Sequence, residues 1–159
     1  MLDPQIQDNI RWHQAEAPFY DSLSTVFNLR EQHYLKQQII KISKQETLPA
    51  LDFGSGTGNV VKYLEKADLE TVAMDISVEM LKQNPAPNKI IAESQYLPFK
   101  DGSFGMITAC SVLHHLPNPV TTVEEMCRVA APCCVVLIPH EPVAGLKAPL
   151  YSRLTYKAL

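Results

Sequence analysis

From Leu48 onward the sequence alternates short apolar runs with amphipathic stretches, and this alternation restricts the fold more than any other feature. The apolar runs fit strands, which we expect at residues 48–53, 71–74, 89–92, 105–112 and 133–138. A chain in which strands alternate with helices forms a parallel sheet, because each strand returns to the sheet through a right-handed crossover. The sequence therefore predicts an α/β fold with a doubly wound, mainly parallel sheet of about five strands in the order 3-2-1-4-5.

Two of the expected helices have clear starting signals. Ser77 and Asn118 are good N-cap residues, and Pro119 suits the first helical turn. In the helix after Asn118 we expect four apolar side chains to face the core, namely Val120, Val123, Met126 and Cys127.

The two ends of the chain flank this alternating region. We expect residues 1–46 to form a helical lid or packing segment, helical mostly from Ser22 onward, and Leu146–Leu159 to form one more helix. Little chain is then left to cover the fifth strand. Its edge should be exposed, or covered by the terminal segment, or paired with a second copy of the chain in a homodimer.

Composition narrows the class of protein. The 159 residues fit a single domain, and a net charge of −3 argues against a nucleic-acid partner, which would need clustered Lys and Arg. No apolar run is long enough to span a membrane, and residues 1–5 lack the features of a secretory signal, so the cytoplasm is the expected compartment. The four cysteines show no C-x-x-C spacing, which favours reduced thiols over a metal site; we expect Cys133 and Cys134 to be buried in their apolar run.

A glycine-rich turn follows the first predicted strand. Gly54, Gly56 and Gly58 permit positive φ and let a ligand approach the backbone, at the edge where a parallel sheet binds nucleotide-like ligands. A dinucleotide fingerprint would need glycine at Asn59, and an NTP-binding P-loop would need a lysine that is missing here. The spacing therefore favours another nucleotide-like ligand.

Two acids suggest which ligand this is. Asp52, at the end of the first strand, suits a cationic group better than a pyrophosphate. Asp75 ends the second strand, where a carboxylate can accept hydrogen bonds from both ribose hydroxyls, and Ile76 beside it can line an adenine ring. S-adenosylmethionine carries both an ammonium group and a ribose.

These residues resemble the class I S-adenosylmethionine-dependent methyltransferases, most of all the small-molecule branch that includes ubiquinone and menaquinone methylases. The likeness extends over about residues 48–140, in the segments 51–58, 74–81, 97–104, 111–118 and 125–129. It implies a Rossmann-like fold, S-adenosylmethionine as cofactor and methyl transfer to a small-molecule acceptor.

The resemblance also implies roles for single residues. The glycine loop would contact the methionine moiety and Asp75 the ribose. Glu93 stands where the family usually has an aspartate that binds the adenine amino group, with the Ser94 amide near the ring. The expected cofactor-binding residues are Asp52, Gly54, Ser55, Gly56, Gly58, Asp75, Ile76, Glu93 and Ser94.

The acceptor side is less well defined by the sequence. Methyl transfer depends mainly on positioning, and a base is needed only for a poorly ionised acceptor. His114 and His115, after the fourth strand, are the candidate bases, although capping or packing of their loop is the commoner role for such residues. Four residues of the N-terminal segment would form an aromatic lid or simply pack: Trp12, His13, Phe19 and Tyr20.

Two other functions remain open at this point. The first is a catalytically silent cofactor-binding module that acts through a protein partner, which the short C-terminal part keeps under consideration. The second is a nicotinamide-dependent dehydrogenase, which Asn59 disfavours because it replaces the third fingerprint glycine.

Overall fold

A central sheet organises the molecule. The computed structural model describes residues 2–23, 29–44, 47–139, 141 and 156–157. Within them the strand order is β3-β2-β1-β4-β5-β6. The strands are β1 (Ala50–Phe53), β2 (Thr71–Asp75), β3 (Asn88–Ile91), β4 (Phe104–Ala109), β5 (Ala130–Leu137) and β6 (Tyr156–Lys157). The first five pair in parallel, which confirms the predicted order 3-2-1-4-5, and β6 pairs antiparallel with β5.

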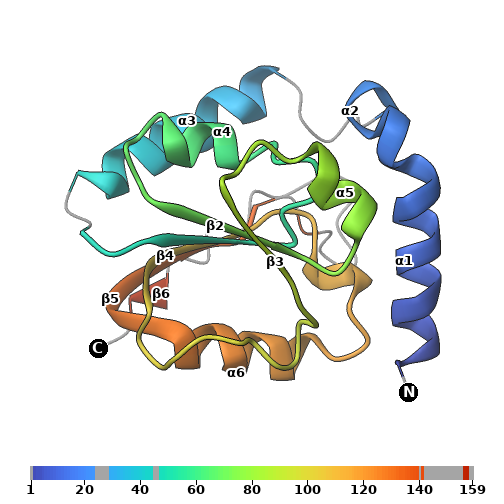
Figure 1. Ribbon diagram of the computed structural model, residues 1–159. Helices are drawn as coiled ribbons and strands as arrows, with labels where there is room; N and C mark the ends of the chain where they lie inside the picture. The colour runs from blue at the N-terminus through green and yellow to red at the C-terminus, as the bar shows by residue number, and fades with distance from the viewer. Residues whose placement is uncertain (1, 24–28, 45–46, 140, 142–155, 158–159) are drawn as a thin grey trace.

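Helices cover both faces of this sheet. They are α1 (Pro4–Glu16), α2 (Tyr20–Leu23), α3 (Leu29–Ser43), α4 (Val61–Glu65), α5 (Val78–Gln83) and α6 (Pro119–Val129), with 3-10 turns η1 (Ala17–Phe19) and η2 (Leu113–His115). In Figure 1, α3 and α4 lie above the sheet and α6 lies below it. Helix α1 stands beyond the end of the sheet toward which β2 points, so it closes the edge where a ligand is expected. No helix in the described part of the chain is long and apolar enough to cross a bilayer.

The predicted helix starts are confirmed. The Ser77 hydroxyl accepts a hydrogen bond from the Met80 amide (3.4 Å) at the start of α5. The Asn118 side chain accepts from the Thr121 amide (3.3 Å) at the start of α6, with Pro119 in the first turn. A side-chain oxygen thus satisfies an amide that has no partner within the helix.

The predicted inner face of α6 is wrong for three of its four residues. Met126 is buried, but Val120 is 66% exposed, Val123 is 38% exposed and Cys127 is also exposed. The buried face includes Thr122, whose hydroxyl donates to the Asn118 carbonyl (3.3 Å) and so loses no hydrogen bond on burial. Apolar residues occupy both faces of this helix, so periodicity alone does not select one.

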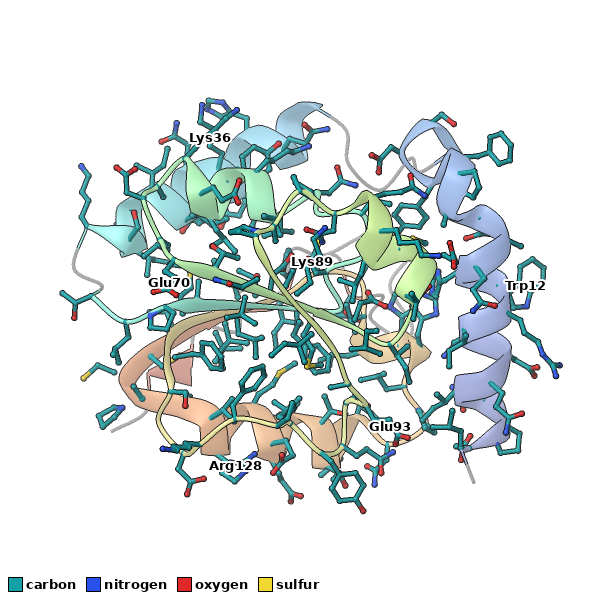
Figure 2. All side chains as sticks on the ribbon, in the orientation of Figure 1. Trp12, Lys36, Glu70, Lys89, Glu93 and Arg128 are labelled. Atoms are coloured by element: carbon teal, nitrogen blue, oxygen red, sulfur yellow. The ribbon has the colours of Figure 1, made fainter. Side chains whose placement is uncertain are left out.

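Arg128, near the end of α6, fixes the connection between β3 and β4. Its guanidinium donates to the Leu97 and Phe99 carbonyls (both 2.9 Å) and to the Asp101 carboxylate (2.8 Å). Figure 2 shows Arg128 at the periphery of the molecule, below the sheet. The same connection begins with residues that reach the functional site described below.

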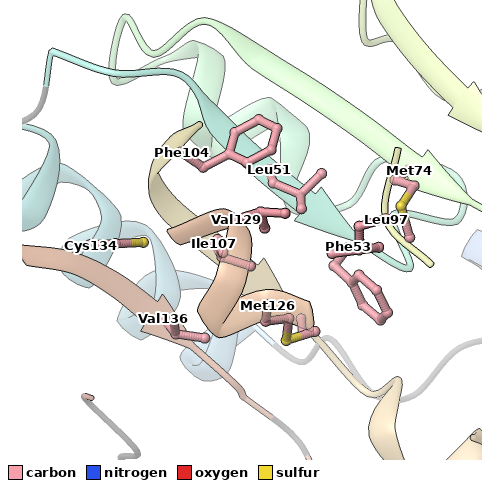
Figure 3. Close-up of a cluster of buried hydrophobic side chains, with 11 residues drawn as sticks. Leu51, Phe53, Met74, Leu97, Phe104, Ile107, Met126, Val129, Cys134 and Val136 are labelled. Carbon is pink, nitrogen blue, oxygen red and sulfur yellow. The ribbon is translucent and has the colours of Figure 1, made fainter. Parts of the chain in front are cut away.

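The main hydrophobic core lies between the sheet and α6. Figure 3 shows Leu51 and Phe53 of β1 and Ile107 of β4 close to Met126 and Val129 of α6, and all five are buried. On the other face a second cluster packs α3 and α4 against the sheet, including Leu35, Ile39, Val60 and Leu64. Val60, Val61 and Leu64 are all buried.

Strand β5 is irregular near its start. Phe104 pairs with Ala130, but Met106 pairs with Val135, so extra residues bulge from β5 between the two positions. Cys133 lies in this bulge with a φ of 68° and is exposed, whereas Cys134 is buried. The expectation of buried thiols is therefore confirmed for Cys134 and wrong for Cys133, because the bulge interrupts the alternation of the strand.

The ends of the chain differ from expectation. The N-terminal segment is already helical from Pro4, where the Asp3 side chain caps α1, and not mainly from Ser22. At the other end, Tyr156–Lys157 forms β6 and not part of a helix, and it pairs with Val135 and Val136. The remaining parts of the predicted terminal helix, 146–155 and 158–159, lie outside the described residues. The terminal segment thus covers part of the β5 edge, which was one of the three expected arrangements; pairing of two copies there stays a prediction.

Candidate functional site

The loop between β1 and α4 takes its shape from its three glycines, which have φ values of 64°, 51° and 87°. A Cβ added at Gly54 would lie 2.4 Å from a Val112 methyl group, and one at Gly58 would lie 2.5 Å from Pro85 Cδ. A Cβ added at Gly56 would meet no atom within 4 Å. Close packing therefore requires glycine at positions 54 and 58, whereas Gly56 borders open space.

Asp52 lies beneath this loop. Its carboxylate is buried and accepts hydrogen bonds from the hydroxyls of Ser55 and Thr108 (both 2.6 Å). Burial raises the pKa of Asp52 to about 6, and the two hydroxyl bonds only partly oppose this rise. Asn84, which sequence reasoning missed, donates to Ser55 Oγ (2.7 Å) and to the Gly56 carbonyl (3.0 Å). This network holds the loop from behind.

Asp75 joins the same loop to the end of β2. One carboxylate oxygen accepts from the Gly56 amide and the other from the Ser77 amide, both at 2.8 Å. Burial raises the pKa of Asp75, while these amides and the nearby His13 oppose the rise. Each oxygen accepts one of these bonds and keeps capacity for a hydrogen bond from a ligand.

These elements border one pocket at the carboxyl ends of the strands. Its lining residues come from the N-terminal segment, the glycine loop and the residues after β2, β3 and β4: Ile6, Asn9, His13, Tyr20, Phe53, Gly54, Gly56, Met74, Asp75, Ile76, Met80, Ala92, Ser94, Cys110, Ser111, Val112, His115 and Leu116. A pocket of mainly apolar walls with a few polar groups is typical of small-molecule sites.

Six of the eleven residues expected to bind the cofactor or to act as a base line this pocket: Gly54, Gly56, Asp75, Ile76, Ser94 and His115. The other five do not: Asp52, Ser55, Gly58, Glu93 and His114. For Asp52, Ser55 and Gly58 the reason is that they lie behind or at the far end of the loop that they shape.

Glu93 is not among the residues that line the pocket, although Ala92 and Ser94 on either side of it are. In Figure 2, Glu93 lies toward the lower edge of the molecule. Contact of Glu93 with the adenine amino group stays a prediction.

The N-terminal segment supplies part of the pocket wall; from the sequence, its aromatic residues were expected to form a lid or simply to pack. His13 and Tyr20 line the pocket, whereas Trp12 and Phe19 are largely exposed. Burial raises the pKa of the Tyr20 phenol, so this hydroxyl is uncharged near neutral pH. Ile6 also lines the pocket, and it carried no recognisable signal in the sequence.

Side-chain hydrogen bonds attach this segment to the site. The Asn9 amide donates to the His115 carbonyl (2.6 Å), and Gln5 donates to the same carbonyl (3.2 Å). At the other end, the Asp21 carboxylate accepts from the Thr57 hydroxyl (2.6 Å) and from Asn59 (2.9 Å). The segment therefore contacts both the loop after β4 and the glycine loop.

The two adjacent histidines have different surroundings. His114 Nδ1 lies 2.9 Å from a Glu141 oxygen, and the Glu141 carboxylate also accepts from the amides of Val112, Leu113 and His114. His115 lines the pocket instead. Burial, with smaller effects of His114 and His13, lowers the pKa of His115, so its imidazole is neutral near pH 7.

A glycine loop after the first strand, an acid after the second and a pocket at the carboxyl edge of a parallel sheet define a domain that binds a nucleotide-like ligand. Residues 51–138 match the family model described as "Methyltransferase domain". The chain belongs to the class I S-adenosylmethionine-dependent methyltransferase family, whose members use S-adenosylmethionine as cofactor.

Relatives of this chain include demethylmenaquinone methyltransferases. The Lactiplantibacillus plantarum protein is 29% identical over 146 residues, which cover 80% of this chain and 62% of the relative. The Mycobacterium sp. strain KMS protein is 30% identical over 166 residues, which cover 99% of this chain and 71% of the relative. The chain spans about three fifths of the length of several of these relatives (62%, 59% and 63%).

Solved structures share the fold. A Methanococcus maripaludis protein assigned as an S-adenosyl-L-methionine-dependent methyltransferase aligns with a TM-score of 0.69 at 20% identity, covering 79% of this chain and 63% of that one. A second neighbour is a Haloferax volcanii protein assigned as a methyltransferase, solved in complex with the Trm112 methyltransferase activator. It aligns with a TM-score of 0.61 at 17% identity, covering 79% of this chain and 58% of that one.

Proposed function

We propose that this protein transfers a methyl group from S-adenosylmethionine to a small-molecule acceptor. One observation carries the proposal: the Gly56 amide donates to the Asp75 carboxylate (2.8 Å), and both residues line the same pocket. The glycine loop and the acid therefore form one binding unit. Membership of the methyltransferase family supports the same function.

The residues present fit this cofactor. The open space over Gly56 leaves room for a ligand against the backbone, and the Asp75 carboxylate keeps acceptor capacity for ribose hydroxyls. Ile76, Met80 and Ala92 provide apolar surface for a purine ring. When bound, the cofactor supplies a methyl group on a sulfonium, and the task of the protein is to position it. In this proposal Asp52, Ser55 and Gly58 act on the cofactor through the shape of the loop.

The acceptor would lie in the other half of the pocket, between the N-terminal segment and the loop after β4. Ile6, Val112 and Leu116 are apolar, and none of the described lining residues is Lys or Arg. Such a surface favours an uncharged acceptor with an apolar body. The demethylmenaquinone methyltransferase relatives act on a molecule of this general kind, as their name indicates. His115, neutral near pH 7, is placed to accept a proton where the acceptor must lose one.

A second function is a domain that binds the cofactor but needs a protein partner for turnover. The Haloferax volcanii neighbour, bound to a methyltransferase activator, motivates it. The two functions differ in one result: binding of S-adenosylmethionine without methyl transfer by the isolated chain would favour the partner-dependent function.

The binding step is tested by calorimetry with S-adenosylhomocysteine on two matched variants. Gly56→Ala and Gly102→Ala both place a Cβ at a residue with positive φ (51° and 65°), and neither Cβ meets an atom closer than 3.8 Å. Each should lose about 1 kcal/mol of stability. Only Gly56→Ala should lose cofactor affinity, by roughly tenfold or more, because only Gly56 borders the pocket. Equal affinity of the two variants for S-adenosylhomocysteine would show that the glycine loop is not part of the binding site.

The transfer step is tested with S-adenosylmethionine labelled in its methyl group. Reduced demethylmenaquinone and simpler hydroquinones serve as trial acceptors, and label is measured in the organic extract. Time-dependent labelling that requires Gly56 supports the proposed activity. Labelling that is unchanged in Gly56→Ala would indicate a contaminating enzyme.

A further inference from the structure

One of the residues that line the pocket carries a buried polar atom without a hydrogen-bond partner. His13 Nδ1 has no hydrogen-bond partner among the described residues, and it is the one side-chain nitrogen or oxygen there that is both buried and without a partner. Such atoms are rare in folded proteins because leaving them unpaired costs stability. An unpaired atom in a residue that lines a ligand pocket is explained if a bound ligand supplies the partner.

The position of His13 on α1 directs it toward this pocket. Its neighbour Trp12 is 68% exposed and points away from the body of the molecule (Figure 2), whereas His13 lines the pocket. The His13 ring stands edge-on to His115, with 5.5 Å between ring centroids, and to Tyr20, at 6.4 Å. The proximity of His13 also lowers the pKa of the Asp75 carboxyl. His13 therefore contacts the acceptor half of the pocket and influences the cofactor half.

The unpaired atom does not result from a loosely attached helix. Asn9, one turn before His13, donates to the His115 carbonyl at 2.6 Å, and Gln5 donates to the same carbonyl at 3.2 Å. These bonds hold α1 against the loop after β4. The His13 ring is thus presented to the pocket by a fixed element.

We propose that His13 is a ligand-binding residue whose Nδ1 forms a hydrogen bond with a hydroxyl group of the molecule bound in the pocket. A hydroxyl both donates and accepts, so it satisfies Nδ1 in either neutral tautomer of the imidazole. The surrounding Asp75 and His115 are also hydrogen-bond acceptors, and the described lining has no Lys or Arg to bind an anion. This inference rests on the proposed function, in which two sources offer a hydroxyl: the ribose of the cofactor and a phenolic or enolic acceptor.

Three variants separate hydrogen bonding from packing. His13→Phe keeps a ring but removes Nδ1, and His13→Asn restores a polar atom near the position of Nδ1. His33→Phe is the matched control, because His33 is an exposed histidine of α3 that does not line the pocket. Thermal unfolding without ligand monitors the fold, and His13→Phe should not be less stable than the parent because it removes an unpaired buried nitrogen.

Two calorimetric titrations distinguish the sources of the hydroxyl. S-adenosylhomocysteine is titrated into each protein, and then 4-ethylphenol and its methyl ether are titrated into each protein saturated with S-adenosylhomocysteine. In at least one titration we expect His13→Phe to weaken binding roughly tenfold, His13→Asn to recover most of the loss, and His33→Phe to match the parent. A loss with S-adenosylhomocysteine assigns the ribose; a loss with the phenol but not with the ether assigns the acceptor.

Unchanged affinity of His13→Phe in both titrations, or an equal loss for phenol and ether, would overturn the role of His13. Failure of the parent protein to bind S-adenosylhomocysteine would instead overturn the proposed function. The phenol titration of the ligand-free protein then still tests His13. A 15N-detected titration adds a direct readout, because the His13 Nδ1 resonance should shift when the hydroxyl binds and stay unchanged with the ether.

Discussion

Replacement of Asp52 by Asn tests how the glycine loop is supported. The carboxylate is 1% exposed, and its partners in the structure are the two hydroxyls of Ser55 and Thr108. Burial raises its pKa from 3.8 to about 6, so the folded protein binds this proton more tightly than the unfolded chain. The stability that protonation contributes is fully present below pH 3.8 and is lost as the pH rises through about 6.

The shift of about two pKa units corresponds to about 3 kcal/mol of stability lost from low pH to pH 8. About half of this loss should occur between pH 5 and pH 8. Asp52→Asn removes the titrating group but keeps its shape. It lowers the free energy of unfolding by about 1 kcal/mol, because the amide replaces one accepting oxygen with a donor. The variant should therefore be more stable than the parent at pH 8, with a smaller advantage at pH 5.

Urea unfolding of both proteins from pH 5 to pH 8 measures this difference, since the other titrating groups are common to both. The free energy of unfolding of the variant minus that of the parent should rise by about 1.5 kcal/mol across the range. A difference that does not change with pH would show that Asp52 keeps an ordinary pKa, and the described burial of this carboxylate under the loop would be wrong.

Three other variants test contacts around the pocket. Asp75→Asn should weaken S-adenosylhomocysteine binding by about 1 to 3 kcal/mol in calorimetry, and unchanged affinity would contradict the role of Asp75 as ribose ligand. In the parent protein, binding should weaken as the pH falls through the raised pKa of Asp75. Asp21→Ala removes two hydrogen bonds to the glycine loop and should speed cofactor dissociation roughly fivefold in stopped-flow measurements. An unchanged dissociation rate would show that these bonds do not help to retain the cofactor. Gly58→Ala combines positive φ with a clash at Pro85 and should cost more than 2 kcal/mol in urea unfolding; a smaller loss would mean that the loop adapts.

Those parts of the fold that depend on local pattern were predictable from the sequence. Alternating apolar and amphipathic segments gave the order of the five parallel strands, because crossover handedness leaves few alternatives. The glycine spacing and Asp75 located the pocket, because parallel strands bring their carboxyl ends together at one edge. Ser77 and Asn118 were recognised because N-capping depends on a residue and its near neighbours.

Features that depend on contacts distant in the sequence were not predictable. Asn9 reaches the His115 carbonyl across 106 positions, and nothing near Asn9 marks it as part of a site. Val120 is exposed because a different face of α6 packs against the sheet. Glu93 is next to two lining residues but is not itself part of the lining, which its place in the sequence does not decide. Pairing of Tyr156–Lys157 with β5 is likewise decided by the partner strand.

The central claim is that S-adenosylmethionine binds between the glycine loop and Asp75. Titration of the 15N-labelled protein with S-adenosylhomocysteine, followed by amide chemical shifts, tests it most directly. We expect saturable shifts at Gly56, Ile76 and Ser94, none at Gly102, and no displacement of the bound S-adenosylhomocysteine by NAD. Absence of saturable shifts, or shifts confined to residues outside the pocket, would contradict it.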